Sequence, residues 1–244
     1  TTLLAEGALI SGDFQAALNT ESALLEEARR RRNPLQTCMA LFGVSSIYIR
    51  RGEDANAIPM LEEELQILEE LPNMASSINS NALLALAHYR QGDVNKAFAY
   101  ASRVQELASD LSPTVYSLHV GFSAVAEVYF DVWEKALQNP NGLLDATHFK
   151  NLAEKALKLL QGFKNIFPIG QPYLALYRGW WYWNMGKTQK AIKVWQVGLE
   201  AAKKYRVLYE EGLLHVRLGS SLKNMPVEQR QHFVVREQRR VVAC

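Results

Sequence analysis

Along most of the chain, apolar residues recur at intervals of three and four, and short polar turns separate the apolar segments. Around one turn these positions are Leu84, Ala87 and Tyr89 before it, and Ala97, Tyr100, Ala101, Val104 and Leu107 after it. This spacing places the apolar side chains on one face of an α-helix. Strand-like alternation is nowhere sustained, so the pattern predicts an all-α protein.

The turns themselves recur. Gly12, Gly52 and Gly92 are spaced 40 residues apart, and an alanine stands five positions after each. The segment around Gly186 repeats this arrangement, and the segment around Ala156 has the alanine without the glycine. The four alanines that follow a glycine are Ala17, Ala57, Ala97 and Ala191. Glycine can close a helix in the left-handed conformation, and alanine allows the next helix to pack closely. Each unit is therefore predicted to be two antiparallel helices joined by a tight turn.

Five such units can be placed, and a sixth begins at 209–222. The first helices are predicted near 2–11, 35–51, 75–91, 112–137 and 172–185. The second helices are predicted near 14–31, 55–71, 94–110, 146–165 and 188–205. Residues 138–145 and 167–172 are predicted to be the main interior loops because they contain proline and glycine. We expect one helical-repeat solenoid over 1–225, followed over 226–244 by a capping helix or a weakly ordered tail.

Composition excludes several classes of function. The chain has 27 Lys+Arg and 25 Asp+Glu, and a net charge of +2 is too small to attract nucleic acid or an anionic membrane by itself. The two cysteines form neither a disulfide framework nor a zinc pattern. No apolar run reaches the roughly 18 residues of a membrane span. We expect a cytoplasmic chain, and its start at Thr1 suggests a fragment of something larger.

The triplet Gly186-Lys187-Thr188 is similar to the end of a phosphate-binding loop. Such a loop needs another glycine five positions earlier and follows a β-strand, but that position is Trp181 and the preceding segment is helical in pattern. We therefore interpret the triplet as a turn between two helices. No nucleotide or other cofactor is predicted.

Other charged and polar groups have simple interpretations. The arginines of 28–34 are interpreted as a solvated helix end, with a patch for an acidic partner as the alternative. The acidic runs at 62–64 and 210–211 are interpreted as solvated helix faces. The five histidines lack metal-ligand spacing, and no serine stands in a nucleophile elbow. We expect no catalytic residue and no metal site.

One aromatic stripe is the strongest candidate for a binding surface. Tyr173, Tyr177, Trp180 and Asn184 are spaced by four, three and four residues, which aligns them along one helix. Aromatic residues at this spacing are more often buried in a core than exposed in a groove, and both interpretations remain open. The corresponding positions of earlier units are Arg50, Tyr89 and Arg90. These seven residues form the candidate partner-binding set.

The repeat resembles the tetratricopeptide repeat. It shares the glycine and alanine positions, small residues at Ala5, Ser45, Ala85 and Gly179, and aromatic residues at Tyr48 and Tyr182. The period is nearer 40 than 34 residues, and Ala8 and His88 replace the aromatic residue in two units. The resemblance implies a right-handed solenoid whose concave groove holds peptides or partner helices.

A second resemblance concerns residues 167–219. This stretch is similar to the C-terminal repeat region of soluble-type class III adenylyl cyclases and related ATPase-linked signalling proteins. The residues that carry it are the Phe-Pro-x-Gly turn, the Gly179-Trp180 helix, the Gly186-Lys187 turn, the helix with Ala191 and Trp195, and Tyr209-Glu210-Glu211-Gly212. The catalytic modules of such proteins lie outside this kind of segment, so the resemblance implies a regulatory role.

Three functions follow as hypotheses. The first is a non-catalytic module that binds a partner protein or other domains of its parent chain. The second is a regulatory part of a cyclase or ATPase. The third is the effector-sensing array of an ATPase-type transcription regulator, in which a small ligand would occupy the groove.

Overall fold

The computed structural model describes residues 12–109, 113 and 115–223, and within these it is an array of α-helices without a strand. The helices are α2 (Phe14–Arg30), α3 (Pro34–Arg51), α4 (Asp54–Glu70), α5 (Met74–Arg90), α6 (Val94–Ala108), α7 (Leu118–Gln138), α8 (Ala146–Ile166), α9 (Gln171–Asn184), α10 (Thr188–Tyr205) and α11 (Leu208–Lys223). The all-α prediction is confirmed, and the helix bounds agree with the predicted ranges to within a few residues.

Some predicted segments lie outside the described residues, and one predicted loop differs from the structure. The helix expected at 2–11, the start of the fourth unit near 112 and the capping helix or tail at 226–244 lie outside the described residues. The predicted loop at 167–172 was too long, because it contains the short 3-10 helix η1 (Pro168–Gly170) and the first residues of α9.

Gly52, Gly92 and Gly186 follow the ends of α3, α5 and α9 as expected. Gly12, Gly52, Gly92 and Gly186 all have left-handed backbones, with φ between 71° and 84°. After α9, the Gly186 N–H donates to the Trp183 carbonyl oxygen at 2.9 Å and the Lys187 N–H donates to the Tyr182 carbonyl oxygen at 2.8 Å. These amides satisfy the end of the helix and are not free to bind phosphate. The triplet at 186–188 is therefore a turn.

The repeated alanines lie where two helices approach most closely. Ala17, Ala57, Ala97 and Ala191 are fully buried. Between α9 and α10 the approach is closer still, because a Cβ at Gly179 would overlap Nε1 of Trp195, which donates to the Leu176 carbonyl oxygen at 2.9 Å. Small residues at these positions set the spacing between helices.

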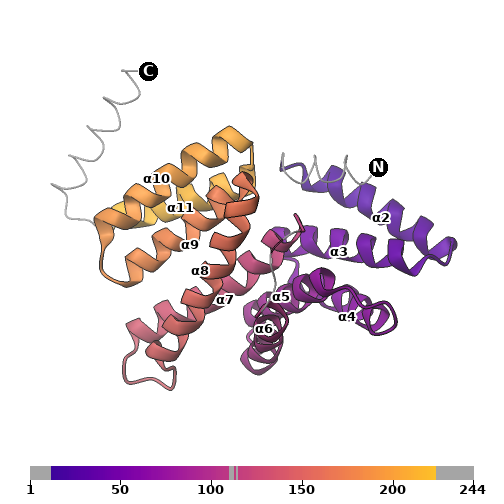
Figure 1. Ribbon diagram of the computed structural model, residues 1–244, viewed down its shortest axis with the longest axis horizontal. Helices are drawn as coiled ribbons and strands as arrows, with labels where there is room; N and C mark the ends of the chain where they lie inside the picture. Colours follow the sequence, from indigo (N-terminus) through magenta and orange to yellow (C-terminus); the bar gives the residue numbers. More distant parts are fainter. Residues whose placement is uncertain (1–11, 110–112, 114, 224–244) are drawn as a thin grey trace.

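The helices form two rows. Apart from α6 and α7, each helix packs against the next one in the chain, and α3, α5, α7, α9 and α11 also pack against one another in that order. We call these five the inner helices. Figure 1 shows that the array curves, so that α11 at the C-terminal side approaches α2 and α3 at the N-terminal side. This curvature brings side chains from the two ends of the chain to one site.

The arginine-rich segment is a helix end. α2 ends at Arg30, and α3 begins at Pro34 with the Asn33 side chain as its N-cap, accepting from the Gln36 N–H at 3.1 Å. Arg30 pairs with Glu27 of its own helix, and Arg29 pairs with Glu63 of α4. The prediction of a solvated helix end is confirmed. Among the described residues, none of the helices is both long and apolar enough to span a membrane.

Candidate functional site

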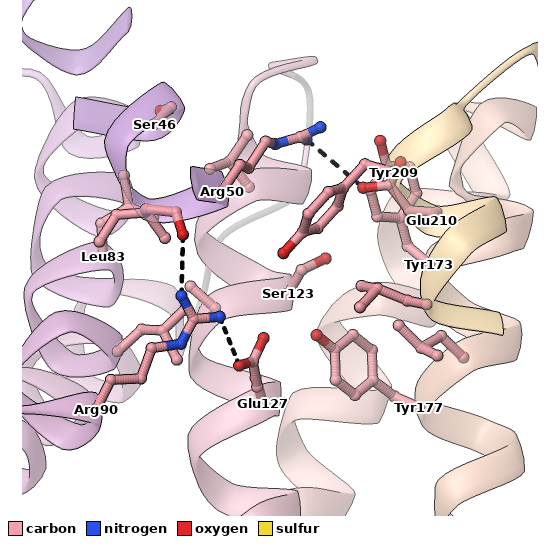
Figure 2. Close-up of a pocket in the computed structure, with 16 residues that line it drawn as sticks. Ser46, Arg50, Leu83, Arg90, Ser123, Glu127, Tyr173, Tyr177, Tyr209 and Glu210 are labelled. Carbon is pink, nitrogen blue, oxygen red and sulfur yellow. Dashed lines mark hydrogen bonds and ion pairs between the residues drawn. The ribbon is translucent and has the colours of Figure 1, made fainter. Parts of the chain in front are cut away.

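The inner helices surround a groove made of two adjoining pockets. A small central pocket of about 50 Å³ is lined by side chains from all five inner helices. Figure 2 shows this pocket and the residues that line it. An open pocket of about 560 Å³ continues from it toward the C-terminal ends of α5, α7 and α11. The two pockets share Arg90, Glu127, Leu176, Tyr177, Tyr209 and Leu213. We call them together the inner groove.

Arg90, at the end of α5, joins three helices. Its Nη1 donates to the Ile49 carbonyl oxygen of α3 at 2.9 Å and lies 3.4 Å from Oδ1 of Asp54, the first residue of α4. Its Nη2 donates to Oε1 of Glu127 on α7 at 2.7 Å (Figure 2). Burial lowers the pKa of Arg90, but the Glu127 carboxylate more than offsets this, and the pKa ends above its ordinary value. The guanidinium therefore stays charged and fixes the wall of the groove.

Arg50 joins the two ends of the array. Its Nη2 lies 3.5 Å from Oε1 of Glu210 on α11, and both side chains are nearly buried. Its guanidinium carbon also lies 4.9 Å from the centre of the Tyr209 ring. Burial lowers the pKa of Arg50, but Glu210, Tyr173 and Tyr209 together more than compensate, and the pKa ends above its ordinary value. A buried ion pair of this kind fixes one relative position of α3 and α11.

Tyr89 belongs to a hydrogen-bonded cluster on the open pocket. Its hydroxyl donates to Oδ2 of Asp131 at 2.6 Å and accepts from Nζ of Lys135 at 2.9 Å. The same ammonium lies 4.9 Å from the centre of the Tyr89 ring, and Lys135 and Asp131 form an ion pair at 2.8 Å. The Lys135 side chain is 57% exposed. It is therefore in reach of a ligand in the groove.

Trp180 is held between charges at the far end of the groove. Its Nε1 donates to Oε2 of Glu134 at 2.6 Å, and the guanidinium carbon of Arg217 lies 3.3 Å from its ring centre. Arg217 and Glu134 also pair with each other at 3.6 Å. This stacking presents a planar cation, backed by an aromatic ring, to the open pocket.

The other three stripe residues differ in exposure. Tyr173 and Tyr177 line the central pocket, but each side chain is only 3–4% exposed, and the Tyr177 ring packs 5.8 Å from the Phe130 ring. Burial raises the pKa of Tyr177 well above its ordinary value. Asn184 does not line either pocket, and its buried Nδ2 has no hydrogen-bond partner. The stripe thus combines core and groove positions.

Sequence reasoning missed the groove residues contributed by α7 and α11. Glu127, Asp131 and Lys135 recur every four residues in a largely apolar helix, and Glu134 follows Asp131 by three residues. Charges that recur at helical spacing within a buried helix indicate a polar face, and this signal was present in the sequence. On α11, Arg217 pairs with Glu134.

Two interpretations of acidic runs were wrong. Glu62 is exposed, but Glu64 is only 1% exposed, and Glu210 is 4% exposed. Glu64 continues the buried stripe of Ala57, Leu61 and Leu68 on α4. The spacing of four, three and four residues places the carboxyl group on the face that packs inward. Both runs therefore contain one residue that is not part of a solvated face.

Buried histidines pack against aromatic rings in this structure. His88 stacks on Tyr100 with ring centres 5.6 Å apart, and His119 lies 4.8 Å from the Tyr173 ring. Burial lowers the pKa of His119 to about 4, so it is neutral. Within the described part of the chain, no three His, Cys, Asp or Glu side chains are grouped so that they could hold a metal ion.

Comparisons with known proteins identify the fold and no family. No protein-family model matches the chain, and no curated protein matches it. The crystal structure of BtubC (BKLC) from P. vanneervenii is similar, with a TM-score of 0.59 and 15% sequence identity, over 94% of this chain and 91% of that chain. No family match supports the resemblance to adenylyl cyclases, which stays a prediction. The likeness to BtubC shows that this chain is a helical module.

Proposed function

We propose that this chain is a non-catalytic interaction module that binds a segment of a partner protein in the inner groove. The proposal includes a tetratricopeptide-like architecture, in which antiparallel helix pairs form a right-handed solenoid. The four left-handed glycines and the buried alanines five residues after them support that architecture. The partner is either a separate protein or another domain of the same parent chain.

The observation that carries the proposal is the open pocket and its row of half-exposed ion pairs. Arg90 of α5 pairs with Glu127 of α7, Lys135 and Asp131 pair within α7, and Arg217 of α11 pairs with Glu134 of α7. All of these residues except Glu134 line one pocket of about 560 Å³. Each pair contains a side chain that is 26–57% exposed. An exposed pair such as Lys135 with Asp131 contributes about 0–1 kcal/mol, so a ligand can exchange partners with it at little cost while Arg90 stays in place.

Apolar and unpaired polar groups add to this surface. Val216 is 64% exposed beside the open pocket, and Leu213 lies next to it. In the central pocket, the buried Oγ atoms of Ser46 and Ser123 have no hydrogen-bond partner. A segment with an apolar side chain between charged ones would match this lining.

Rigidity before binding favours the groove as a binding surface. Arg90 fixes α3, α4 and α7 to one another, and Arg50 fixes α3 to α11. A wall that is already ordered loses little conformational entropy when a ligand binds.

The experiment is a selection of binding peptides from a random display library, followed by affinity measurements with matched variants. Arg217→Ala removes a groove cation, and Arg103→Ala removes a 57% exposed cation on α6 that does not line the groove. The proposal predicts selected peptides that lose at least tenfold in affinity with Arg217→Ala and keep it with Arg103→Ala. Peptides that bind both variants as well as the unchanged chain would contradict it. Tyr177→Ala is unsuitable as a probe because it would open a hole in the core.

A further inference from the structure

A second cavity, distinct from the open pocket, lies beside the central pocket. It has a volume of about 380 Å³, and we call it the lateral cavity. Side chains from α2, α3, α4, α5, α7, α9 and α11 line it. It shares Ser46, Arg50, Val120, Tyr173 and Glu210 with the central pocket. Met39 and Val115, which are 54% and 44% exposed, mark its outer side.

Carboxyl groups outnumber cations in the lining. Glu21, Glu64 and Glu210 contribute carboxyl groups, and among the described residues Arg50 is the only lysine or arginine in the lining. Arg50 already pairs with Glu210. His119 adds no charge because burial lowers its pKa to about 4. Burial also raises the pKa of Glu64 to about 8, and a cation bound beside it would favour the ionised carboxylate, so the cavity favours a ligand that brings positive charge.

Glu64 is the strongest indication of a missing partner. Its Oε2 atom is buried and has no hydrogen-bond partner, and the side chain is 1% exposed. Leaving a buried carboxyl oxygen unpaired costs free energy, so native proteins rarely do so without a reason. A donor supplied by a ligand would remove this cost.

The backbone of α3 makes room for a second carboxyl group. A Cβ at Gly43 would lie 2.5 Å from Oε2 of Glu21, so only glycine allows the α2 carboxylate to lie against α3 beside the cavity. Glu21 itself occupies the inward stripe of Ala17, Leu25 and Ala28 on α2. The spacing of four, four and three residues places the Glu21 carboxyl group on the buried face of α2.

The rest of the lining is apolar and aromatic. Phe42, Tyr116 and Tyr173 contribute rings, and Met39 and Ile47 contribute aliphatic surface. Among the described residues, no three acidic, His or Cys side chains are close enough together to hold a metal ion. An organic cation with an apolar body therefore fits the lining better than a metal ion does.

We propose that the lateral cavity binds an alkylammonium group, whose N–H groups donate to Glu64 and Glu21 while its apolar body packs against Phe42 and Met39. Two sources supply this chemistry: a free organic amine, and the lysine side chain of a bound polypeptide. This site is separate from the open pocket and does not depend on the function proposed above.

The test is an NMR titration of the ¹⁵N-labelled chain with phenethylamine, taken to millimolar concentration, where fragment-sized ligands bind. 2-Phenylethanol has nearly the same shape without the charge. We expect phenethylamine to shift amide signals of α2, α3 and α4 around the cavity and to bind at least tenfold more tightly than the alcohol. Equal binding of the two compounds, or shifts confined to other helices, would overturn the proposal.

Variants identify the carboxyl groups. Glu64→Gln and Glu21→Gln keep the size of each side chain, and each should weaken phenethylamine binding at least tenfold. Glu62→Gln, on the exposed face of α4, is the matched control and should leave binding unchanged. Unchanged binding in both cavity variants overturns the proposal. If one of the two cavity variants fails to fold, the other variant and the comparison of phenethylamine with 2-phenylethanol still test the proposal.

A third ligand separates the two sources. Nα-acetyl-lysine N-methylamide carries the ammonium group as a lysine side chain within a peptide would. Tighter binding of this compound than of phenethylamine assigns the cavity to a lysine of a partner, and the reverse assigns it to a free amine. Arg217→Ala should leave either interaction unchanged, so failure of the groove and failure of this cavity are distinguishable.

Discussion

Nη2 of Arg90 lies 2.7 Å from Oε1 of Glu127, and this hydrogen bond fixes the end of α5 to the middle of α7. The other terminal nitrogen of the same guanidinium donates to the Ile49 carbonyl oxygen at the end of α3. One side chain thus determines how three successive helix pairs meet at the groove. The shape of the proposed binding surface depends on it.

Replacing Arg90 should therefore destabilise the whole array. Arg90→Ala leaves the carboxylate of Asp54, which is 6% exposed, without its cation, and we expect a loss of about 2–3 kcal/mol in the free energy of unfolding. Urea denaturation followed by circular dichroism measures this. Arg103→Ala breaks an exposed pair with Glu106 and should cost less than about 0.5 kcal/mol. Equal midpoints for the two variants would show that Arg90 is not a structural link.

Alanine substitutions at two glycines should change the stability of the chain in opposite directions. At Gly179 an added methyl group would overlap the indole of Trp195, so Gly179→Ala should destabilise the chain by about 1–3 kcal/mol. At Gly212 nothing lies within 4 Å, and Gly212→Ala in α11 should stabilise the chain by about 0.5–1 kcal/mol because alanine favours the helix. Thermal melts of both variants check this. The close packing of α9 on α10 is disproved if the two substitutions act in the same direction.

Glu64 should make stability depend on pH. Burial raises its pKa from 4.5 to about 8, and the nearby Ser80 hydroxyl opposes this only in part. The folded chain therefore holds the proton more tightly than the unfolded chain does. This contribution to stability is complete below the unfolded pKa and is lost as the pH rises through about 8, with a slope of up to about 1.4 kcal/mol per pH unit.

The measurement is urea denaturation between pH 4 and pH 9, which brackets the range from the unfolded to the folded pKa. Glu64→Gln should flatten the profile and make the chain more stable than the unchanged chain at the alkaline end, because no buried carboxyl group has to ionise. Glu62→Gln, on the exposed face of the same helix, should keep the slope. A slope that survives in Glu64→Gln assigns the pH dependence to another group.

The local features of the fold could be predicted from the sequence because local physics determines them. The turn at Gly186 needs a left-handed residue, and the position of Ala191 needs a small one, so both leave a mark in the pattern. Glu64 and Glu210 were misplaced for a different reason. The prediction followed their charge and ignored their position on an apolar stripe, although the stripe determines which face of the helix is buried.

The candidate site depended on pairings that no local pattern contains. Glu127 lies 37 residues after Arg90. Glu210 reaches Arg50 only because the array curves far enough to bring α11 back to α3. The stripe on α9 marked the right region, but its aromatic residues Tyr173, Tyr177 and Trp180 are all buried, and the groove presents the guanidinium of Arg217 that lies over the Trp180 ring. All the helix contacts together determine how the stack curves. The curvature in turn determines which distant residues pair with each other.

The most direct test of the proposed groove is hydrogen exchange, measured by mass spectrometry, of the chain with and without a peptide selected for binding. The account predicts slower exchange in α7 and α11 around Glu134 and Arg217, with no change in α6 on the outer row. Protection confined to α6 or α10, with the exchange of α7 and α11 unaltered, would contradict the claim that the inner groove is the binding surface.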